Sequence, residues 1–315
     1  MENNNTTQVK EFFLLGFPNL LEMQILLFIF FSVAYILTVS ENILIILIIQ
    51  LHTNLQKPMY FFLSNLSFLE ICYISVTVPN LLVNVLTDIK TISFSGCMTQ
   101  LFFFISLMCT ECVLLAVMAF DRYIAVCYPL HYVRIMNHEL CVQLAAFSWI
   151  AGFVTTLIKI SFISRLSFCG PNIINHFFCD ISPMLNLACI DMSVAEMVDF
   201  ILALVILLIP LLVTVMSYIR IIYSILKIPT SVGRQKAFST CASHLTVVTI
   251  FFSTTLFMYA RPKKAKSVDG NKIVSLLYAV FTPIINPFIY CLRNKEIWNI
   301  LNKYFCCKRV FTYYK

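Results

Sequence analysis

Charged residues inside apolar stretches are the positions of this chain at which chemistry is easiest to foresee. The stretch MAFDRYIAVC, from Met118 to Cys127, carries an acid–base pair, Asp121 and Arg122. Membrane segments rarely carry such a pair unless it lies at the water boundary or has a function. Because an arginine is always charged and planar, Arg122 can pair with Asp121 at rest and be released to contact a partner's backbone carbonyls or helix end. The pair therefore has the chemistry of a switch.

Two further carboxylates, Glu70 and Glu111, lie within apolar stretches. Glu111 precedes Arg122 by 11 residues, about 17 Å along a helix, which puts it near mid-membrane. Desolvation disfavours the charge of a lone buried carboxylate, whereas a bound cation preserves it. With Glu41 these acids could instead form an ion path, so an ion-coupled transporter or channel is an alternative. The chain shows no internal repeat and no Gly/Pro-broken helix pair in support of that alternative.

The chain shows no catalytic constellation: it has no nucleotide-binding loop, no HExxH and no Ser/His/Asp set placed by context. Function must therefore come from binding and conformational shift, and we expect no enzyme, no cofactor and no nucleic-acid partner. His176 and Cys179 could ligate copper or zinc only through a thiolate at Cys179. A disulfide at Cys179 is the better-supported reading, and it leaves His176 as a loop residue making hydrogen bonds.

Composition indicates the elements that position these residues. The chain is 60% hydrophobic and 12% charged, with a mean hydropathy of +0.88, far outside the range of soluble domains. Glycine is scarce and short alternating strands are absent, which argues against a β-barrel, whereas helices satisfy their own backbone in lipid. We predict an all-α integral membrane protein, a bundle of seven transmembrane helices. The spans lie at about 24–50, 58–86, 97–127, 140–163, 195–226, 236–260 and 272–292.

The distribution of Lys and Arg sets the orientation. One side of the membrane would carry thirteen Lys and Arg against three Asp and Glu, and the other side nine of each. The basic side is cytoplasmic, although a cluster from Arg261 to Lys266 falls in a loop placed outside. We therefore predict an extracellular tail at 1–23, a domain of seven transmembrane helices at 24–292, and a cytoplasmic tail at 293–315 with a short amphipathic eighth helix. No cleavable signal peptide is visible, so the first span must act as the insertion signal.

Several residues outside the spans are candidates for covalent modification. Asn4 and Asn5 begin overlapping glycosylation sequons in the outer tail. Four of the 13 cysteines fall outside, where an oxidising compartment favours disulfides, and three pairings are open to Cys97, Cys169, Cys179 and Cys189. Cys306 and Cys307 follow the amphipathic stretch and are either palmitoylated or free thiols in a reducing cytosol.

Several motifs in this order resemble one family. They are KPMYFFL from Lys57, MAFDRYIAVCYPLHY, Ser217-Tyr218, KAFSTCASHL from Lys236 to Leu245, PIINPFIY from Pro283 to Tyr290, and Leu292-Arg293-Asn294. The chain resembles the rhodopsin-like G-protein-coupled receptors, specifically the olfactory receptors of the tetrapod-type (class II) branch, from about Phe12 to Asn294. Three positions depart from the pattern: Glu70 replaces a commoner aspartate, Ser40-Glu41-Asn42 a Gly-Asn, and Phe252-Ser253 a Tyr-Gly.

The resemblance implies roles for particular residues. It implies a cytoplasmic switch in which helices rearrange around Arg122, and disulfides Cys97–Cys179 and Cys169–Cys189. It also implies an inactive-state sodium ion held by Glu70 and Glu111, although the longer Glu70 could instead replace the ion by hydrogen-bonding Glu111. A hydrogen-bonded neutral His244 is favoured over a pH sensor, although titration near neutral pH stays open. Pro287 removes a backbone hydrogen bond and allows a kink, and Asn286 can satisfy the freed groups. The switch set is Asp121, Arg122, Tyr123, Tyr218, His244, Asn286, Pro287 and Tyr290.

The family's ligand cavity lies between the outer halves of its third, fifth, sixth and seventh helices. The spacing of three and four residues puts each matching set on one helical face, where it lines the cavity or merely packs helix against helix. The wall is apolar with a few hydroxyls and has no acid on the third helix, which predicts a small, neutral, mostly hydrophobic odorant. The matching residues are Phe104, Ile105, Met108, Cys109, Cys112, Leu202, Ile206, Phe252, Thr255, Leu256, Tyr259, Ser275, Leu276 and Ala279.

The resemblance also implies the partners and location of the chain. We expect a receptor that binds a small volatile odorant and activates a heterotrimeric stimulatory olfactory-type G protein to raise cAMP. The expected location is the plasma membrane of sensory neuron cilia, in contact with membrane lipid, with surface delivery aided by a trafficking chaperone. The same receptor could act as a chemosensor outside the olfactory epithelium.

Overall fold

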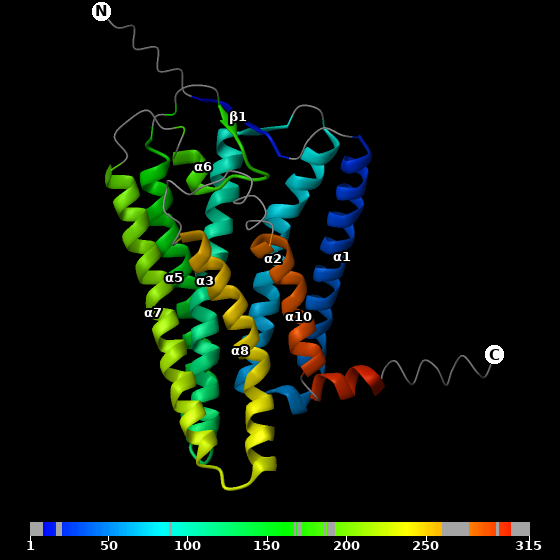
Figure 1. Ribbon diagram of the computed structural model, residues 1–315, viewed down its shortest axis with the longest axis vertical. Helices are drawn as coiled ribbons and strands as arrows, with labels where there is room; N and C mark the ends of the chain where they lie inside the picture. Colours follow the sequence, from blue (N-terminus) through cyan, green and yellow to red (C-terminus); the bar gives the residue numbers. More distant parts are fainter. Residues whose placement is uncertain are drawn as a thin grey trace, which may run out of the picture.

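The structure is a computed structural model, and the chain it describes is a bundle of long helices (Figure 1). The described residues are 9–16, 21–87, 90–166, 168, 172–185, 187, 193–259, 277–293 and 296–303.

Within the described ranges, seven helical segments run along the bundle and correspond to the seven predicted spans to within a few residues at most ends. Five have both the length and the hydropathy of a membrane span, and the apolar parts of the remaining two, Cys241–Leu256 and Ala279–Ile289, are shorter. The seven are α1 (Leu21–Leu51), α2 (Pro58–Leu86), α3 (Phe94–Cys127), α5 (His138–Ile163), α7 (Ser193–Leu226), α8 (Ser231–Tyr259), and the π-helical turn η3 (Leu277–Phe281) continued by α10 (Thr282–Arg293). Shorter helices are η1 (Thr53–Leu55), α4 (Tyr132–Ile135), α6 (Ile181–Leu185) and residues 296–303.

Local sequence signals explain where several helices begin. Pro58 occupies the first turn of α2, where its missing N–H is not needed and its fixed φ suits a helix. The Ser93 hydroxyl accepts a hydrogen bond from the Gly96 N–H at the start of α3, and the Asn137 side chain accepts one from the Leu140 N–H at the start of α5. Side-chain acceptors at these positions satisfy N–H groups that have no partner within the helix.

The third spanning helix lies at the centre of the bundle. In its most apolar window 83% of the residues of α3 are buried, against 17% for α1 and 28% for α7. The outward faces of α1 and α7 expose large aliphatic side chains, such as Leu26 at 68% and Leu212 at 62%. An apolar face of this extent is the face that lipid covers, so the outer helices meet the membrane and α3 carries the interior.

A glycine sets the close approach of α3 and α5. A Cβ atom built on Gly152 would lie 2.6 Å from the Ser106 carbonyl oxygen and 2.8 Å from the Thr110 backbone nitrogen. Both atoms belong to the backbone of α3 and cannot rotate away. Gly152 therefore allows a contact between these helices that no larger residue permits.

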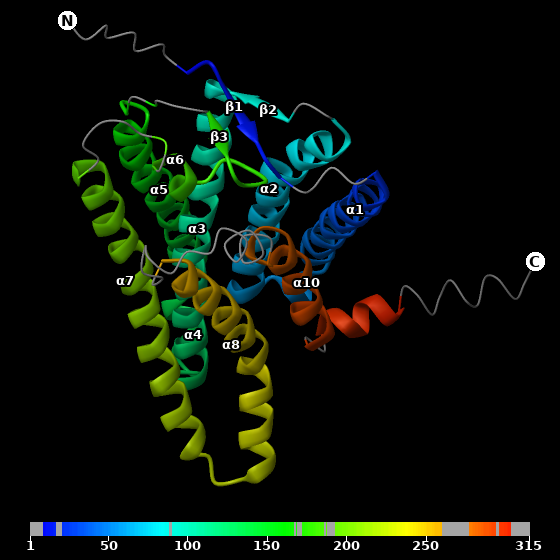
Figure 2. The same ribbon diagram turned by 45° about the horizontal axis from the view of Figure 1, so that its top comes forward.

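The outer end of the bundle carries a small sheet that the sequence reading did not foresee. It has the order β2-β1-β3, with β1 (Glu11–Leu14) antiparallel to β2 (Thr91–Ser93) and parallel to β3 (Ile173–Ile174). Figure 2 shows the three strands together over the helix ends. The alternation exposed–buried–exposed–buried in β1 turns Phe12 inward, where it is 0% exposed and its ring packs edge-on against Phe168. Part of the predicted outer tail is thus an ordered central strand.

Candidate functional site

At the end of α3 that is predicted to be cytoplasmic, a tyrosine holds the acidic residue Asp121. The Tyr132 hydroxyl donates a 2.8 Å hydrogen bond to Asp121 Oδ1, from the short helix α4. Burial, together with the charge and the hydrogen bond of Asp121, raises the pKa of Tyr132, so this residue stays a donor. Asp121 and Arg122 form no ion pair, contrary to the resting pair expected from the sequence. Adjacent helical residues point about 100° apart, so their side chains do not face each other.

A second polar contact joins α7 and α8 beside the same end of α3. The Tyr218 hydroxyl lies 2.6 Å from His244 Nδ1, and the two rings are stacked. Around them Ala119, Ile221, Ile225 and Cys241 form one buried apolar cluster, against which Tyr123 packs. The structure therefore brings predicted switch residues from three helices together.

The remaining switch residues lie on α3 and α10. The Tyr123 hydroxyl donates to the Tyr128 hydroxyl at 3.5 Å, a long hydrogen bond at the edge of the bundle. Pro287 lies within α10 and is buried. The Tyr290 backbone belongs to α10, but its side chain lies outside the described part of the chain.

Buried carboxylates occupy the middle of the bundle. Asn286 Nδ2 on α10 donates a 2.7 Å hydrogen bond to Glu70 Oε1 on α2, and both side chains are almost fully buried. Glu111 on α3 is also buried, it acts electrostatically on Glu70, and its Oε1 has no hydrogen-bond partner among the described residues. Within the described ranges no group of three or more His, Cys, Asp or Glu side chains gathers around one point.

The predicted ligand wall lies in the bundle interior. Phe104, Ile105, Cys109 and Ala279 belong to the buried cluster of the outer half. Cys112 and Phe252 belong to that of the inner half, and Met108 contacts both clusters. Leu202, Ile206 and Leu256 are partly buried. The structure thus places wall residues from α3, α7, α8 and η3 in the bundle interior.

Of the hydroxyl-bearing side chains expected in this wall, the structure describes that of Thr255. The Thr255 hydroxyl donates a 2.7 Å hydrogen bond to the Phe251 carbonyl of its own helix, so its proton is already used. The Tyr259 side chain, Ser275 and Leu276 lie outside the described residues.

An open groove of about 460 Å³ lies elsewhere, between the outer ends of α2 and α3. It contains none of the predicted wall residues. Its lining residues are Val76, Asn80, Ile92, Ser93, Ser95, Gly96, Thr99, Gln100 and Phe103.

A disulfide joins the top of α3 to the loop that follows β3. Cys97 and Cys179 are bonded with their Cα atoms 5.5 Å apart, which confirms the pairing implied by the resemblance. The Cys179 N–H donates to Gln100 Oε1, and the Phe178 ring packs 5.0 Å from that of Phe104. This loop therefore closes the outer side of the predicted ligand wall.

The disulfide also argues against the alternative metal site at His176 and Cys179. The Cys179 sulfur is consumed, and His176 Nδ1 lies 3.2 Å from the Phe178 carbonyl oxygen, as expected for a loop histidine making hydrogen bonds. The second implied pair, Cys169 and Cys189, lies outside the described residues, as do Asn4, Asn5, Cys306 and Cys307.

Sequence reasoning missed a buried ion pair between α5 and α7. Lys159 Nζ lies 2.8 Å from Asp199 Oδ1, with the lysine side chain 1% exposed and the aspartate 19%. Both residues are among the nine Lys and Arg and the nine Asp and Glu that the predicted orientation places on the outer side. They fall inside the predicted spans 140–163 and 195–226, and that position was the signal that could have revealed them.

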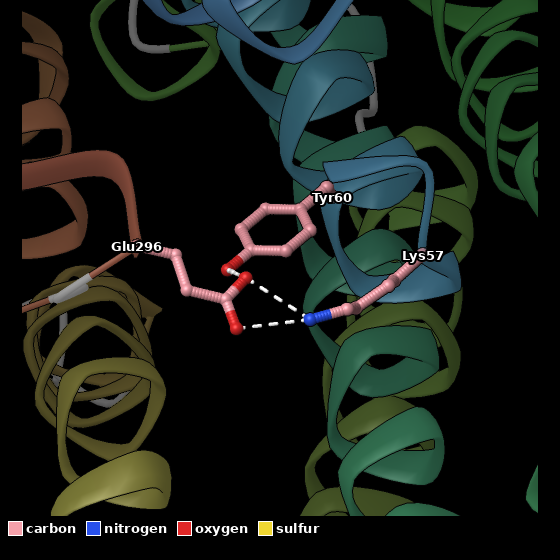
Figure 3. A network of polar contacts seen from close by, with 3 residues as sticks. All are labelled: Lys57, Tyr60 and Glu296. Atoms are coloured by element: carbon pink, nitrogen blue, oxygen red, sulfur yellow. Dashed lines mark hydrogen bonds and ion pairs between the residues drawn. The ribbon is translucent and has the colours of Figure 1, made fainter. Parts of the chain in front are cut away.

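A second contact that the sequence did not reveal links the start of α2 to the short helix at residues 296–303. Lys57 Nζ lies 2.9 Å and 3.0 Å from the two carboxylate oxygens of Glu296, and the Tyr60 hydroxyl donates to the same carboxylate at 2.8 Å (Figure 3). Ile297 is fully buried against the inner cluster while Trp298 is exposed, as expected for an amphipathic helix. The segment 296–303 is therefore tied to the bundle by both polar and apolar contacts.

Comparison with known proteins agrees with this arrangement. The chain is 61% identical to olfactory receptor 6B1 of Homo sapiens over 308 residues, covering 98% of each chain. It is 57% identical to olfactory receptor 6A2 of Homo sapiens, covering 96% of this chain and 93% of that one. The crystal structure of squid rhodopsin superposes with a TM-score of 0.71 at 16% identity, covering 91% of this chain and 81% of that chain, which supports the seven-helix receptor fold. Residues 31–308 match the family model described as olfactory receptor, and the chain belongs to the olfactory receptor family.

Proposed function

We propose that this odorant receptor binds a small, neutral, mostly hydrophobic odorant inside the bundle and activates a stimulatory olfactory-type G protein, raising cAMP. The family supports an odorant ligand and a G-protein partner. The proposed site of action is the plasma membrane of sensory neuron cilia, reached with the help of a trafficking chaperone. The same activity outside the olfactory epithelium would make the receptor a general chemosensor.

The surroundings of Arg122 support the part of the proposal that concerns coupling to a G protein. Asp121 is held by Tyr132, and Arg122 Nε is buried without a hydrogen-bond partner among the described residues. A charge-bearing donor left unused in the resting arrangement favours any conformation in which a partner satisfies it. Separation of Tyr218 from His244 would open the cluster between α7 and α8 and admit that partner.

The chemistry of the wall supports the choice of ligand. Phe104, Ile105, Cys109 and Phe252 are each at most 3% exposed and present apolar surface. A charged ligand would lose its hydration there with little compensation. A neutral ligand gains from burial and needs only one or two hydrogen bonds to fix its orientation.

Cells that express surface-verified receptor should show a dose-dependent rise in cAMP with neutral volatile odorants. Arg122→Ala, verified at the surface at the same level, should abolish the rise. An equal response from Arg122→Ala would show that the arginine has no part in coupling.

The hydroxyls of the wall give a second test, with an odorant that carries a carbonyl. Tyr259→Phe should weaken the binding of this odorant by about 1–3 kcal/mol if a buried acceptor loses its donor. Thr255→Val should have the smaller effect, since its proton is engaged at Phe251. An undiminished response in both variants would contradict this placement.

We also propose a sodium ion between Glu70 and Glu111 as an allosteric ion of the inactive state. Glu111 Oε1 has no hydrogen-bond partner among the described residues, and Glu70 accepts from Asn286, so the two carboxylates support an oxygen-rich site that carries negative charge. Raising sodium from zero to physiological concentration should raise the unfolding temperature and lower basal cAMP in the native receptor but not in Glu111→Gln. An unfolding temperature that does not respond to sodium in the native receptor would contradict the site.

A further inference from the structure

The groove between the outer ends of α2 and α3 has a size that the proposed function does not explain. Its volume of about 460 Å³ lies within the range of small-molecule sites, and it shares no residue with the predicted ligand wall. Two of its lining residues, Thr99 and Phe103, are exposed although α3 is largely buried. They are one helical turn apart and so share a face. The groove is therefore a place where the central helix meets the surroundings of the bundle.

The polarity of the lining changes along the bundle. α2 runs toward the outer end, so Asn80 lies nearer that end than Val76. α3 runs away from the outer end, so Ser95 lies nearer it than Phe103, by about 12 Å along the helix. Apart from Ile92 of β2, the outer part of the groove offers hydroxyl and amide groups, and the deeper part offers apolar surface. This gradient matches a lipid of the outer leaflet, whose polar group lies at the membrane boundary.

Two polar side chains of the groove have hydrogen-bonding capacity to spare. The Thr99 hydroxyl forms no hydrogen bond within the part of the chain that the structure describes. Asn80 Oδ1 accepts from Asn84 Nδ2 at 3.3 Å, whereas Asn80 Nδ2 is buried and has no partner among the described residues. A buried donor without an acceptor costs free energy. A ligand hydroxyl would remove this cost after a small shift of the Asn80 side chain, since Nδ2 is shielded from water.

The charge of the lining narrows the class of lipid. The described residues that line the groove are all uncharged. The phosphate of a phospholipid or the carboxylate of a fatty acid would find no cation there to replace its hydration. A neutral lipid with one hydroxyl needs only a donor and an acceptor. Among neutral lipids, a rigid ring system loses less conformational freedom on binding than a flexible acyl chain does.

We infer that the groove between the outer ends of α2 and α3 is a sterol-binding site. The sterol hydroxyl lies in the outer part of the groove, where it donates to the Thr99 hydroxyl oxygen and accepts from Asn80 Nδ2. The ring system packs along Val76 and Phe103, toward the membrane interior. The site lies apart from the predicted ligand wall, so the inference does not require the proposed odorant response.

A bound sterol would also stabilise the outer end of the receptor. Gln100 lines the groove, its Nε2 donates to the Val76 carbonyl of α2, and its Oε1 accepts from the Cys179 N–H of the outer loop. Ile92 and Ser93 of the lining belong to β2, which pairs with β1. A sterol in the groove therefore contacts residues that join two helices, the loop and the sheet.

The test uses full-length receptor in phosphatidylcholine nanodiscs, with radiolabelled cholesterol as the probe. The native receptor should bind the label saturably, and cholesterol should raise its unfolding temperature. Cholestane, a hydrocarbon with the same ring skeleton and no hydroxyl, should compete at least about tenfold more weakly than unlabelled cholesterol, because it makes neither hydrogen bond. A diacylglycerol, which is neutral and carries a hydroxyl on a flexible body, should also compete poorly.

Substitutions at Thr99 separate the groove from the rest of the surface. Thr99→Trp fills the groove from an exposed position and should abolish saturable binding. Thr99→Val removes only the hydroxyl and should weaken binding about three- to tenfold. The same substitutions at Thr249, on an exposed face of α8, should leave binding unchanged. Asn80→Leu/Asn84→Leu removes the amide pair together, leaves no buried amide unpaired, and should weaken binding as Thr99→Val does.

Three outcomes would overturn the inference. The first is a native receptor without saturable cholesterol binding. The second is binding that Thr99→Trp leaves unchanged, which would place the sterol elsewhere on the surface. The third is competition by the diacylglycerol as strong as that by cholesterol, which would assign the groove to acyl lipids. Because the test measures binding and not cAMP, a receptor that fails to signal would count only against the proposed function.

Discussion

Single polar residues in this receptor are held by partners on other helices. Tyr132 of α4 holds Asp121 of α3, Tyr218 of α7 contacts His244 of α8, and Asn286 of α10 holds Glu70 of α2. Each contact crosses between elements, so moving one helix breaks a hydrogen bond inside an apolar interior. Breaking such a bond without replacing it leaves a buried polar group unsatisfied. The free-energy cost of that is larger than the net stability that the bond contributes when it is formed. The contacts therefore favour discrete arrangements of the helices over gradual ones.

The Lys57–Glu296 contact gives a prediction about pH. Burial raises the pKa of Glu296, but hydrogen bonds from Lys57 and Tyr60 and the charge of Lys57 outweigh it, so the pKa lies below its ordinary value of 4.5. A lowered pKa stabilises the folded state above pH 4.5, and this contribution is lost as the pH falls through the lowered value.

The native receptor should therefore unfold at a higher temperature than Glu296→Gln near neutral pH, and the difference should persist to about pH 5 and shrink below pH 4.5. Because both partners are about half exposed, the difference should amount to roughly 0.2–1 kcal/mol. Thermal unfolding at several pH values measures it. A difference that grows on acidification would contradict the assignment.

At the scale of the elements, the packing of α3 against α5 depends on Gly152. Gly152→Ala places a Cβ atom against the backbone of α3, and overpacking of this kind costs about 1–3 kcal/mol. The variant should have a lower unfolding temperature and less protein at the cell surface. In the matched control, Gly233→Ala, the new atom meets only the side chains of Thr230 and Ile228, which can move. Equal unfolding temperatures for the two variants would show that the helices can separate without cost.

The helices were predictable from sequence because each is a long local signal. The span 58–86 coincides with α2, and the others differ from the helices by a few residues at most ends. The sheet was not predictable, because its strands are two to four residues long and come from three distant segments. The motif around Asp121 was visible, but its partner Tyr132 was not, since nothing in the sequence says how α4 folds back. The pairing of Lys159 with Asp199 was not predictable, although both lie inside predicted spans, because it depends on how α5 packs against α7.

At the scale of the whole molecule, the disulfide and the sheet close the outer end together. Replacing Cys97 and Cys179 by serine removes a link across 82 positions of the chain, which should cost about 2–5 kcal/mol of stability. The double variant should unfold at a lower temperature, and a reductant should lower the unfolding temperature of the native receptor toward it. If neither change affects unfolding, the hydrogen bond of Cys179 to Gln100 and the apolar packing of Phe178 hold the loop without the disulfide.

The central position of β1 also governs the order in which the receptor can be assembled. Phe13 pairs with Ile173, which is made 160 residues later. At roughly 5–20 residues per second this is a delay of about 8–32 seconds. Until Ile173 has been made, the edge of β1 that pairs with β3 is unpaired, and Phe12 lacks its contact with Phe168. Unpaired edges and exposed aromatic rings are what chaperones bind and what aggregates. We therefore expect delivery to the cell surface to depend in part on how long β1 waits for β3, which is made only after the fourth membrane helix, α5.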